Sequence, residues 1–132
     1  MRAILIDPEK RSVTEIDMPE GNRSSVDEMN KLIGSDVFCC GHRFSNEDTI
    51  YCDDEGLLKE EQPAMFRIGL RGGIIPGKGL VMGSDEEGNS VDAKTQIEDL
   101  FGKLRWLVAV DPGGSTIIDS AARTPSETKE AV

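Results

Sequence analysis

The sequence predicts an α+β fold: a single small domain of mostly antiparallel sheet with two short helices and a disordered C-terminal tail. Short apolar or alternating segments are separated by turn residues, and two further segments carry apolar residues at helical spacing. The last part of the chain is rich in Pro, Gly, Ser and Thr. A length of 132 residues suits one domain. We therefore expect a compact domain over residues 1–110 and a flexible tail over residues 111–132.

The first two strands are predicted from their patterns of apolar residues. Residues 3–7 form a nearly continuous apolar run, which is typical of a buried strand. Residues 12–16 alternate polar and apolar side chains, which is typical of a strand with one exposed face. Residues 8–11 have the composition of a turn, so we expect the second strand to return beside the first.

The first helix is predicted over residues 26–33. Ser25 and Glu28 have the spacing of a capping box, in which each side chain bonds to the backbone amide of the other residue. Gly34 is a suitable residue to end the helix. The apolar residues that follow the helical period are Val26, Met29, Leu32 and Ile33.

The middle of the chain predicts a series of short strands. Residues 37–40 and 49–52 flank a polar loop, and residues 65–68 and 80–83 are two further apolar segments. The sequences that follow Cys52 and Ser84 share an acidic turn that ends in Gly, so we interpret them as two similar hairpin ends.

The second helix is predicted over residues 95–103, where Ile97, Leu100 and Phe101 lie on one face. Residues 105–110 then form the last strand of the domain. We expect Trp106, the sole Trp, to lie in the core under this helix. Within the tail, Ile117 and Ile118 are apolar, and we expect them to dock on the domain or on a partner.

The chain is strongly acidic, with a formal net charge of -10. Such a surface repels duplex DNA and anionic membranes, and it fits a basic protein partner. The longest apolar run, residues 107–110, is far too short to span a membrane. Acidity can also serve solubility alone. The expected partner-binding residues lie in the two acidic turns: Asp53, Asp54, Glu55, Asp85, Glu86 and Glu87.

The cysteines point to a reducing, cytoplasmic compartment, because their number is odd and no signal peptide precedes the first strand. Cys39 and Cys40 are adjacent in a strand, so their side chains point to opposite faces and one is expected in the core. With Cys52 and His42 they are the only soft metal ligands, and no Cys-x-x-Cys pair exists. We predict no metal and no cofactor. A metal site completed by Asp53, or a Cys–His nucleophile pair, remains an alternative.

The segment from Gly72 to Lys78 has the spacing of a phosphate-binding loop, G-x-x-x-x-G-K. Gly79 then stands where such a loop needs Ser or Thr, and a strand rather than a helix is predicted to follow. We therefore predict that the chain is not a nucleoside triphosphatase of this kind. An anionic ligand held without hydrolysis stays open. The candidate residues for it are Arg67, Arg71, Lys78 and Arg105.

Two segments resemble a known family. One is residues 2–8 with residues 14–16, and the other is residues 77–83 with residues 85–88. They are similar to an uncharacterised family of small proteins carried by phages, prophages and plasmids, and the resemblance covers residues 1–107. It implies accessory proteins that act in the cytoplasm of a bacterial host, and it supplies no catalytic residues.

Together these observations predict a non-enzymatic protein that binds and neutralises a host factor in antiviral defence, with its acidic surface against a basic protein partner. Two alternatives stay open. One is an oligomer that sequesters a small anionic nucleotide signal. The other is a small enzyme that depends on a metal or on Cys. A homo-oligomer that completes a sheet between copies is also compatible with the apolar strands.

Overall fold

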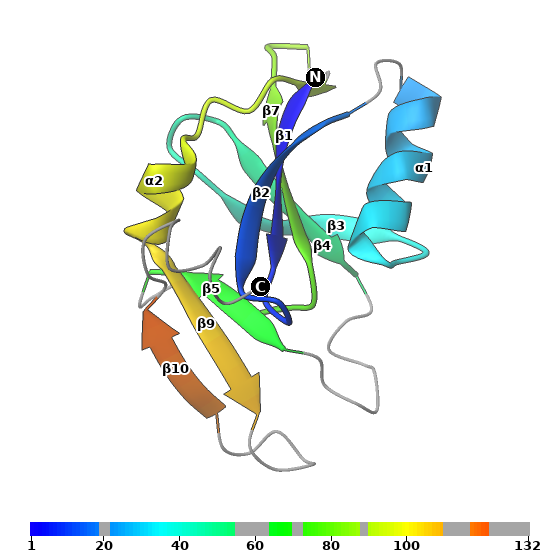
Figure 1. The fold of residues 1–132 in the computed structure, drawn as a ribbon. Coiled ribbons are helices and arrows are strands. Elements are labelled where there is room, and N and C mark those ends of the chain that lie inside the picture. Colours follow the sequence, from blue (N-terminus) through cyan, green and yellow to red (C-terminus); the bar gives the residue numbers. More distant parts are fainter. Residues whose placement is uncertain (19–21, 55–63, 70–72, 88–89, 110–116, 122–132) are drawn as a thin grey trace.

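A computed structural model gives the fold for residues 1–18, 22–54, 64–69, 73–87, 90–109 and 117–121 (Figure 1). These residues form two helices and two sheets in which all the strand pairs are antiparallel. The predicted α+β class is therefore confirmed.

The larger sheet, here called sheet A, has the order β2-β1-β7-β4-β3, with β8 paired to β7. The smaller sheet, here called sheet B, has the order β10-β9-β5-β6. The strands of sheet A are β1 (Arg2–Asp7), β2 (Ser12–Asp17), β3 (Phe38–Arg43), β4 (Thr49–Asp53), β7 (Gly79–Ser84) and β8 (Ser90–Val91). Those of sheet B are β5 (Met65–Ile68), β6 (Ile75–Pro76), β9 (Leu104–Ala109) and β10 (Ile117–Ala121). The helices are α1 (Asn22–Ile33) and α2 (Ile97–Phe101).

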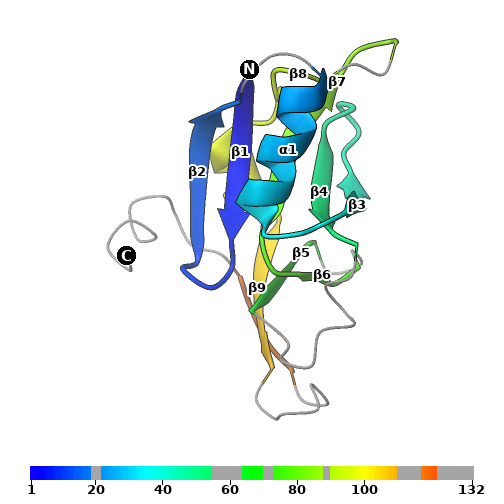
Figure 2. The ribbon, with the colours of Figure 1, turned by 90° about the vertical axis from the view of Figure 1, so that its right-hand side faces the viewer.

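The central strands of sheet A, β1, β7 and β4, are buried on both faces. Helix α1 lies across one face (Figure 2), where Met29 and Ile33 pack on the odd-numbered side of β1. The even-numbered residues Ile4 and Ile6 point to the other face, where sheet B and α2 lie. A strand that is covered on both faces needs apolar side chains at successive positions. This explains the continuous apolar runs of β1 and β7.

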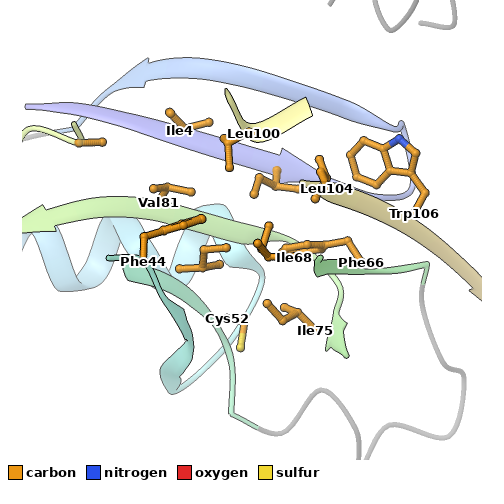
Figure 3. Close-up of a cluster of buried hydrophobic side chains, with 13 residues drawn as sticks. Ile4, Phe44, Cys52, Phe66, Ile68, Ile75, Val81, Leu100, Leu104 and Trp106 are labelled. Carbon is orange, nitrogen blue, oxygen red and sulfur yellow. The ribbon is translucent and has the colours of Figure 1, made fainter. Parts of the chain in front are cut away.

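The main core fills the space between the two sheets (Figure 3). Phe66 and Leu104 from sheet B meet Val81 from sheet A, and Leu100 of α2 closes the cluster. Trp106 is only 4% exposed in this core, so the predicted burial of this residue is confirmed.

Helix α1 differs from its prediction at one end. It starts at Asn22 rather than Val26, so Ser25 lies inside the helix and the predicted capping box is wrong. Asn22, Ser24 and Ser25 lie close together here, and Asn and Ser both favour helix starts, so the sequence pattern does not select one of them. The predicted end is confirmed: Gly34 has φ +78° and its amide donates to the Asn30 carbonyl.

Helix α2 is shorter than the predicted range of 95–103. Thr95 precedes it, because the amide and hydroxyl of Thr95 both bond to Asp48 instead of joining a helix. At the other end, Gly102 ends the helix and β9 begins at Leu104.

The two acidic turns differ in the structure. The turn at Asp85 joins β7 to β8, which is the predicted hairpin. The segment after Asp53 leads from β4 in sheet A to β5 in sheet B, so the predicted hairpin at that position is wrong. Similar turn residues do not decide whether the next strand pairs with the last one.

The expectation of a tail without fixed structure does not hold for Ile117–Ala121. These residues form β10, in which Ile117 lies opposite Ala109 and Ile118 opposite Val108. The docking of this apolar segment on the domain is thereby confirmed. The other tail residues after position 110 lie outside the described part of the chain.

A strap over residues 92–95 connects sheet A to α2. On one side the Ala93 amide donates to the Arg2 carbonyl, and the Arg2 guanidinium donates to the carbonyls of Ala93 and Thr95. On the other side the fully buried Asp48 accepts from the amides of Lys94 and Thr95. The strap is thus held from both sides by strongly polar groups.

Gly79→Ala is expected to lower the free energy of unfolding by about 2–3 kcal/mol, because the added methyl group overpacks the core. A Cβ at Gly79 would lie 2.5 Å from Phe66 Cζ and 2.9 Å from Ile50 Cγ2. Gly73→Ala is the matched control, because a Cβ there meets no heavy atom within 4 Å. Urea unfolding followed by circular dichroism measures the change, and equal midpoints for both variants would contradict this packing.

Asp48→Ala is expected to lower the free energy of unfolding by about 3 kcal/mol, because it leaves buried donors of the strap without an acceptor. Thr95→Val removes the hydroxyl that donates to Asp48 over 2.5 Å and accepts from Asn46 over 3.1 Å, and we expect a loss of about 1–2 kcal/mol. Ser45→Ala, an exposed change in the same loop, should stay within about 0.5 kcal/mol of wild type. Thermal unfolding of the three variants tests this order, and a stable Asp48→Ala protein would refute the role of the strap.

Candidate functional site

Exposed carboxylates gather at one end of sheet A. Arg2 lies opposite Asp17, and Ile4 lies opposite Val81, so the start of β1 meets the ends of β2 and β7. The β7–β8 turn and the start of the strap follow at the same end (Figure 1). We call this region the acidic end, and its exposed members are Glu15, Asp17, Asp85, Glu86, Glu87 and Asp92.

Part of the acidic end is neutralised within the fold. The Met1 ammonium group lies 3.0 Å from an Asp17 oxygen, and Arg2 forms an ion pair with Glu15. The Arg2 amide also donates to Asp92 over 2.7 Å. These carboxylates therefore hold β1, β2 and the strap together as well as carrying charge.

A hydrogen bond to one of its own acidic residues, Asp85, stabilises the β7–β8 turn. Asp85 accepts from the Glu87 amide over 2.9 Å, which is a common side-chain bond within turns. Glu86 and Glu87 are exposed at this turn. Among the described residues no ion pair involves either carboxylate. The Glu86 and Glu87 carboxylates therefore face solvent, on a turn that the Asp85 hydrogen bond stabilises.

The other predicted acidic turn lies at the opposite end of the sheet. Asp53 is 9% exposed at the end of β4, Asp54 is exposed, and Glu55 lies outside the described residues. Because β4 and β7 are antiparallel, their C-terminal ends point in opposite directions. A six-residue strand is about 20 Å long, so the two turns do not form one surface.

The predicted cationic residues are also divided. Arg67 on β5 lies directly opposite Arg105 on β9, and both are half-buried. Lys78 lies before β7, level with Asp53 if the β4–β7 register is continued. Arg71 lies outside the described residues. Two of the four candidates for an anion site therefore come together, on sheet B.

The segment around Lys78 does not have the geometry of a phosphate-binding loop. The chain enters strand β7 at Gly79, whereas such a loop leads into a helix. Gly79 is buried against Phe66, so a Ser or Thr side chain has no space there. The predicted strand after Lys78 is therefore confirmed, and Gly79 serves packing.

The cysteines alternate between core and solvent as predicted. Cys52 is buried in the core, Cys39 is half-buried beside it, and Cys40 is exposed. Burial, followed by the neighbouring Cys39, raises the pKa of Cys52 to about 12. Burial is also the main cause that raises the pKa of Cys39. Because only the thiolate is a good nucleophile, both thiols react slowly at neutral pH.

His42 stacks edge-on against Phe44, with ring centroids 4.8 Å apart. Burial, and secondarily the charge of Lys103, lowers the pKa of His42 below its usual value. Across the described ranges of the chain, no three His, Cys, Asp or Glu side chains are placed to hold a metal ion.

A hollow of about 370 Å³ lies between the β3–β4 loop and α2. Asn46 donates to the Thr95 hydroxyl over 3.1 Å at its wall, and Lys94, Lys103 and Glu98 surround it. Sequence reasoning missed this hollow, because it joins polar loop residues that lie far apart in the chain. It carries both signs of charge and so does not select one class of ligand.

In the part of the chain that is described, no helix is long and apolar enough to cross a membrane.

Comparison with known proteins identifies the family of the chain. No curated protein and no solved structure matches the chain. A family model described as a domain of unknown function, DUF3846, matches residues 1–105, which include β1 through α2 and thus the acidic end. The chain therefore belongs to the DUF3846 family, as its resemblance to an uncharacterised family predicted.

Proposed function

We propose that this protein is a non-catalytic binder, which uses its acidic end against a basic surface of a host protein and so neutralises that protein. The observation that carries the proposal is the position of Glu86 and Glu87, exposed on a turn that Asp85 builds. A turn fixed by its own hydrogen bond presents its charges with little loss of conformational freedom on binding.

Electrostatics supports a protein partner. The net charge of -10 attracts basic surfaces and speeds their encounter, whereas it repels nucleic-acid backbones and anionic membranes. At the acidic end, Glu15 and Asp17 already have cationic partners within the fold. Glu86 and Glu87 are therefore the carboxylates that we expect to form ion pairs with an Arg or Lys of the partner.

The cysteine chemistry favours a binder over a Cys-dependent enzyme. The raised pKa values of Cys39 and Cys52 leave little thiolate at neutral pH. Cys52 is also only 5% exposed, so a substrate has poor access to its sulfur. A stoichiometric partner needs neither an activated nucleophile nor a deep pocket.

The resemblance to phage, prophage and plasmid proteins suggests the setting. In that setting the partner is a component of antiviral defence in the cytoplasm of the bacterial host. A small accessory protein of this kind works by occupying a surface that the host factor needs for its own nucleic acid or protein target. An acidic turn that competes with a phosphate backbone fits that role.

The paired change Glu86→Lys and Glu87→Lys is expected to weaken binding of the co-purifying host protein at least tenfold, because it replaces attraction by repulsion. The partner is obtained by gentle purification of the tagged protein from its host, and affinity is measured at low and high salt. Wild-type binding should weaken as salt rises, because the contact is exposed to screening.

The matched control is the pair Asp27→Lys and Asp36→Lys, which changes the net charge equally at exposed positions of α1 and the segment after it. This control should keep most of the affinity. An equal loss in both pairs would mean that overall charge and not the acidic end governs binding, and would refute the assignment of the site.

A second candidate function, sequestration of a small anionic nucleotide by an oligomer, is favoured by the register of β5 and β9. Arg67 lies directly opposite Arg105, and two guanidinium groups on adjacent strands suit a phosphate that accepts bonds from both. This candidate needs a ligand of nucleotide mass that stays bound through purification.

The paired change Arg67→Lys and Arg105→Lys is expected to remove such a ligand, because Lys keeps the charge but loses the two-pronged hydrogen bonds. Native mass spectrometry of the gently purified protein measures the bound mass. The control pair Arg11→Lys and Arg43→Lys, at exposed positions, should retain it. A wild-type protein without added mass would exclude this candidate and leave the protein-binding proposal standing.

A further inference from the structure

Two cysteines from adjacent strands face each other at the edge of sheet A. Cys39 on β3 lies directly opposite Cys52 on β4, and their sulfur atoms are 3.8 Å apart. Directly opposed residues of antiparallel strands have Cα atoms about 4.5–5.5 Å apart, which lies within the range that disulfides span. Rotation of the two side chains is therefore enough to bring the sulfur atoms into bonding distance.

A glycine in an irregular part of β3 lies beside the pair. The register of β3 and β4 shifts between Cys40 and His42, so Gly41 forms an irregularity beside the pair. A Cβ at Gly41 would lie 2.9 Å from the Cys52 sulfur, so the missing side chain keeps room there. Figure 3 shows the Cys52 side chain near Ile75, at the border of the core.

The two sulfur atoms differ in access. Cys39 is half-buried on β3, which is the last strand in the order of sheet A, whereas Cys52 is buried. Cys40 is exposed and follows Cys39 directly, so its side chain points to the opposite face of β3. An oxidant therefore reaches Cys39 before Cys52, and Cys52 is the thiol placed to react with the product.

We propose that Cys39 and Cys52 are a redox modification site, at which a hydroperoxide such as hydrogen peroxide forms a reversible disulfide between β3 and β4. The Cys39 thiolate attacks one peroxide oxygen, the O–O bond breaks, and water leaves after the second oxygen takes a proton. The sulfur is then a sulfenic acid. The Cys52 thiolate attacks this sulfur, the S–O bond breaks, and the S–S bond forms with release of a second water.

The balance of the reaction is complete with the peroxide alone. The two thiols lose two protons and two electrons, and hydrogen peroxide takes them up to form two molecules of water. A dithiol reductant reverses the step by thiol–disulfide exchange. Because burial raises the pKa of both thiols, the reaction is slow at neutral pH and its rate should rise up to about tenfold per pH unit as thiolate is formed.

The test uses the full chain with Cys40→Ser, which removes the exposed thiol as a source of bonds between molecules. The folded protein is treated with hydrogen peroxide at mildly alkaline pH, unfolded, and alkylated. The expected result is an intact mass lower by two hydrogen atoms, no alkylated cysteine, and a peptide that links Cys39 to Cys52. Dithiothreitol should restore two alkylation sites, and the oxidised protein should unfold several degrees higher.

Cys39→Ser in the same background is the matched control, because it changes a half-buried edge residue and leaves Cys52 in place. This variant should form no internal bond. The proposal is overturned if both thiols remain alkylatable after treatment, if each is oxidised separately to a sulfinic acid, or if the bond forms only in unfolded protein. In wild-type protein, a bond from Cys40 to either partner would overturn it as well.

Discussion

The connection between sheet A and helix α2 depends on the carboxylate of Asp48. It is fully buried and accepts hydrogen bonds from the amides of Lys94 and Thr95 and from the Thr95 hydroxyl. A buried carboxylate is costly unless such donors surround it, so its presence fixes the strap in one position. Arg2 holds the strap from the other side. The position of α2, and through Leu100 the core between the sheets, follows from that anchor.

This constraint separates structural acidic residues from those available for binding. Asp48 and Asp7 are buried, and Asp7 accepts from the amides of Glu9 and Lys10 in the β1–β2 turn. Their charge is used to satisfy backbone donors, so replacing them would disturb the fold before any partner could be tested. Among the described residues, the Glu86 and Glu87 carboxylates accept no such hydrogen bonds from backbone amides. A large net charge is therefore not a uniform surface property, and only part of it can serve recognition.

The longer strands before residue 110 could be predicted because each carries its burial pattern locally. Three of the four residues of Met65–Ile68 are apolar and buried, and the start of β7 is recognisable from its apolar run. The strap could not be predicted, because Asp48 lies in a polar loop and its partners follow 46 and 47 residues later. For the same reason the sequence suggested one acidic surface where the structure has two ends. Whether turns are neighbours depends on strand order, and strand order is a property of the assembled sheet.

Strand direction also decides how the two proposed sites relate to each other. The acidic end lies where β7 ends, level with the start of β4, whereas Cys52 lies near the other end of β4. About three residues of β4 separate Thr49 from Cys52, which corresponds to roughly 10 Å along the strand. The sulfur atoms also face the core between the sheets, and Glu86 and Glu87 face solvent. A bond between β3 and β4 would thus stiffen the sheet edge without adding charge to the acidic end. The proposed binding and the proposed oxidation are therefore separable, and loss of one would leave the other measurable.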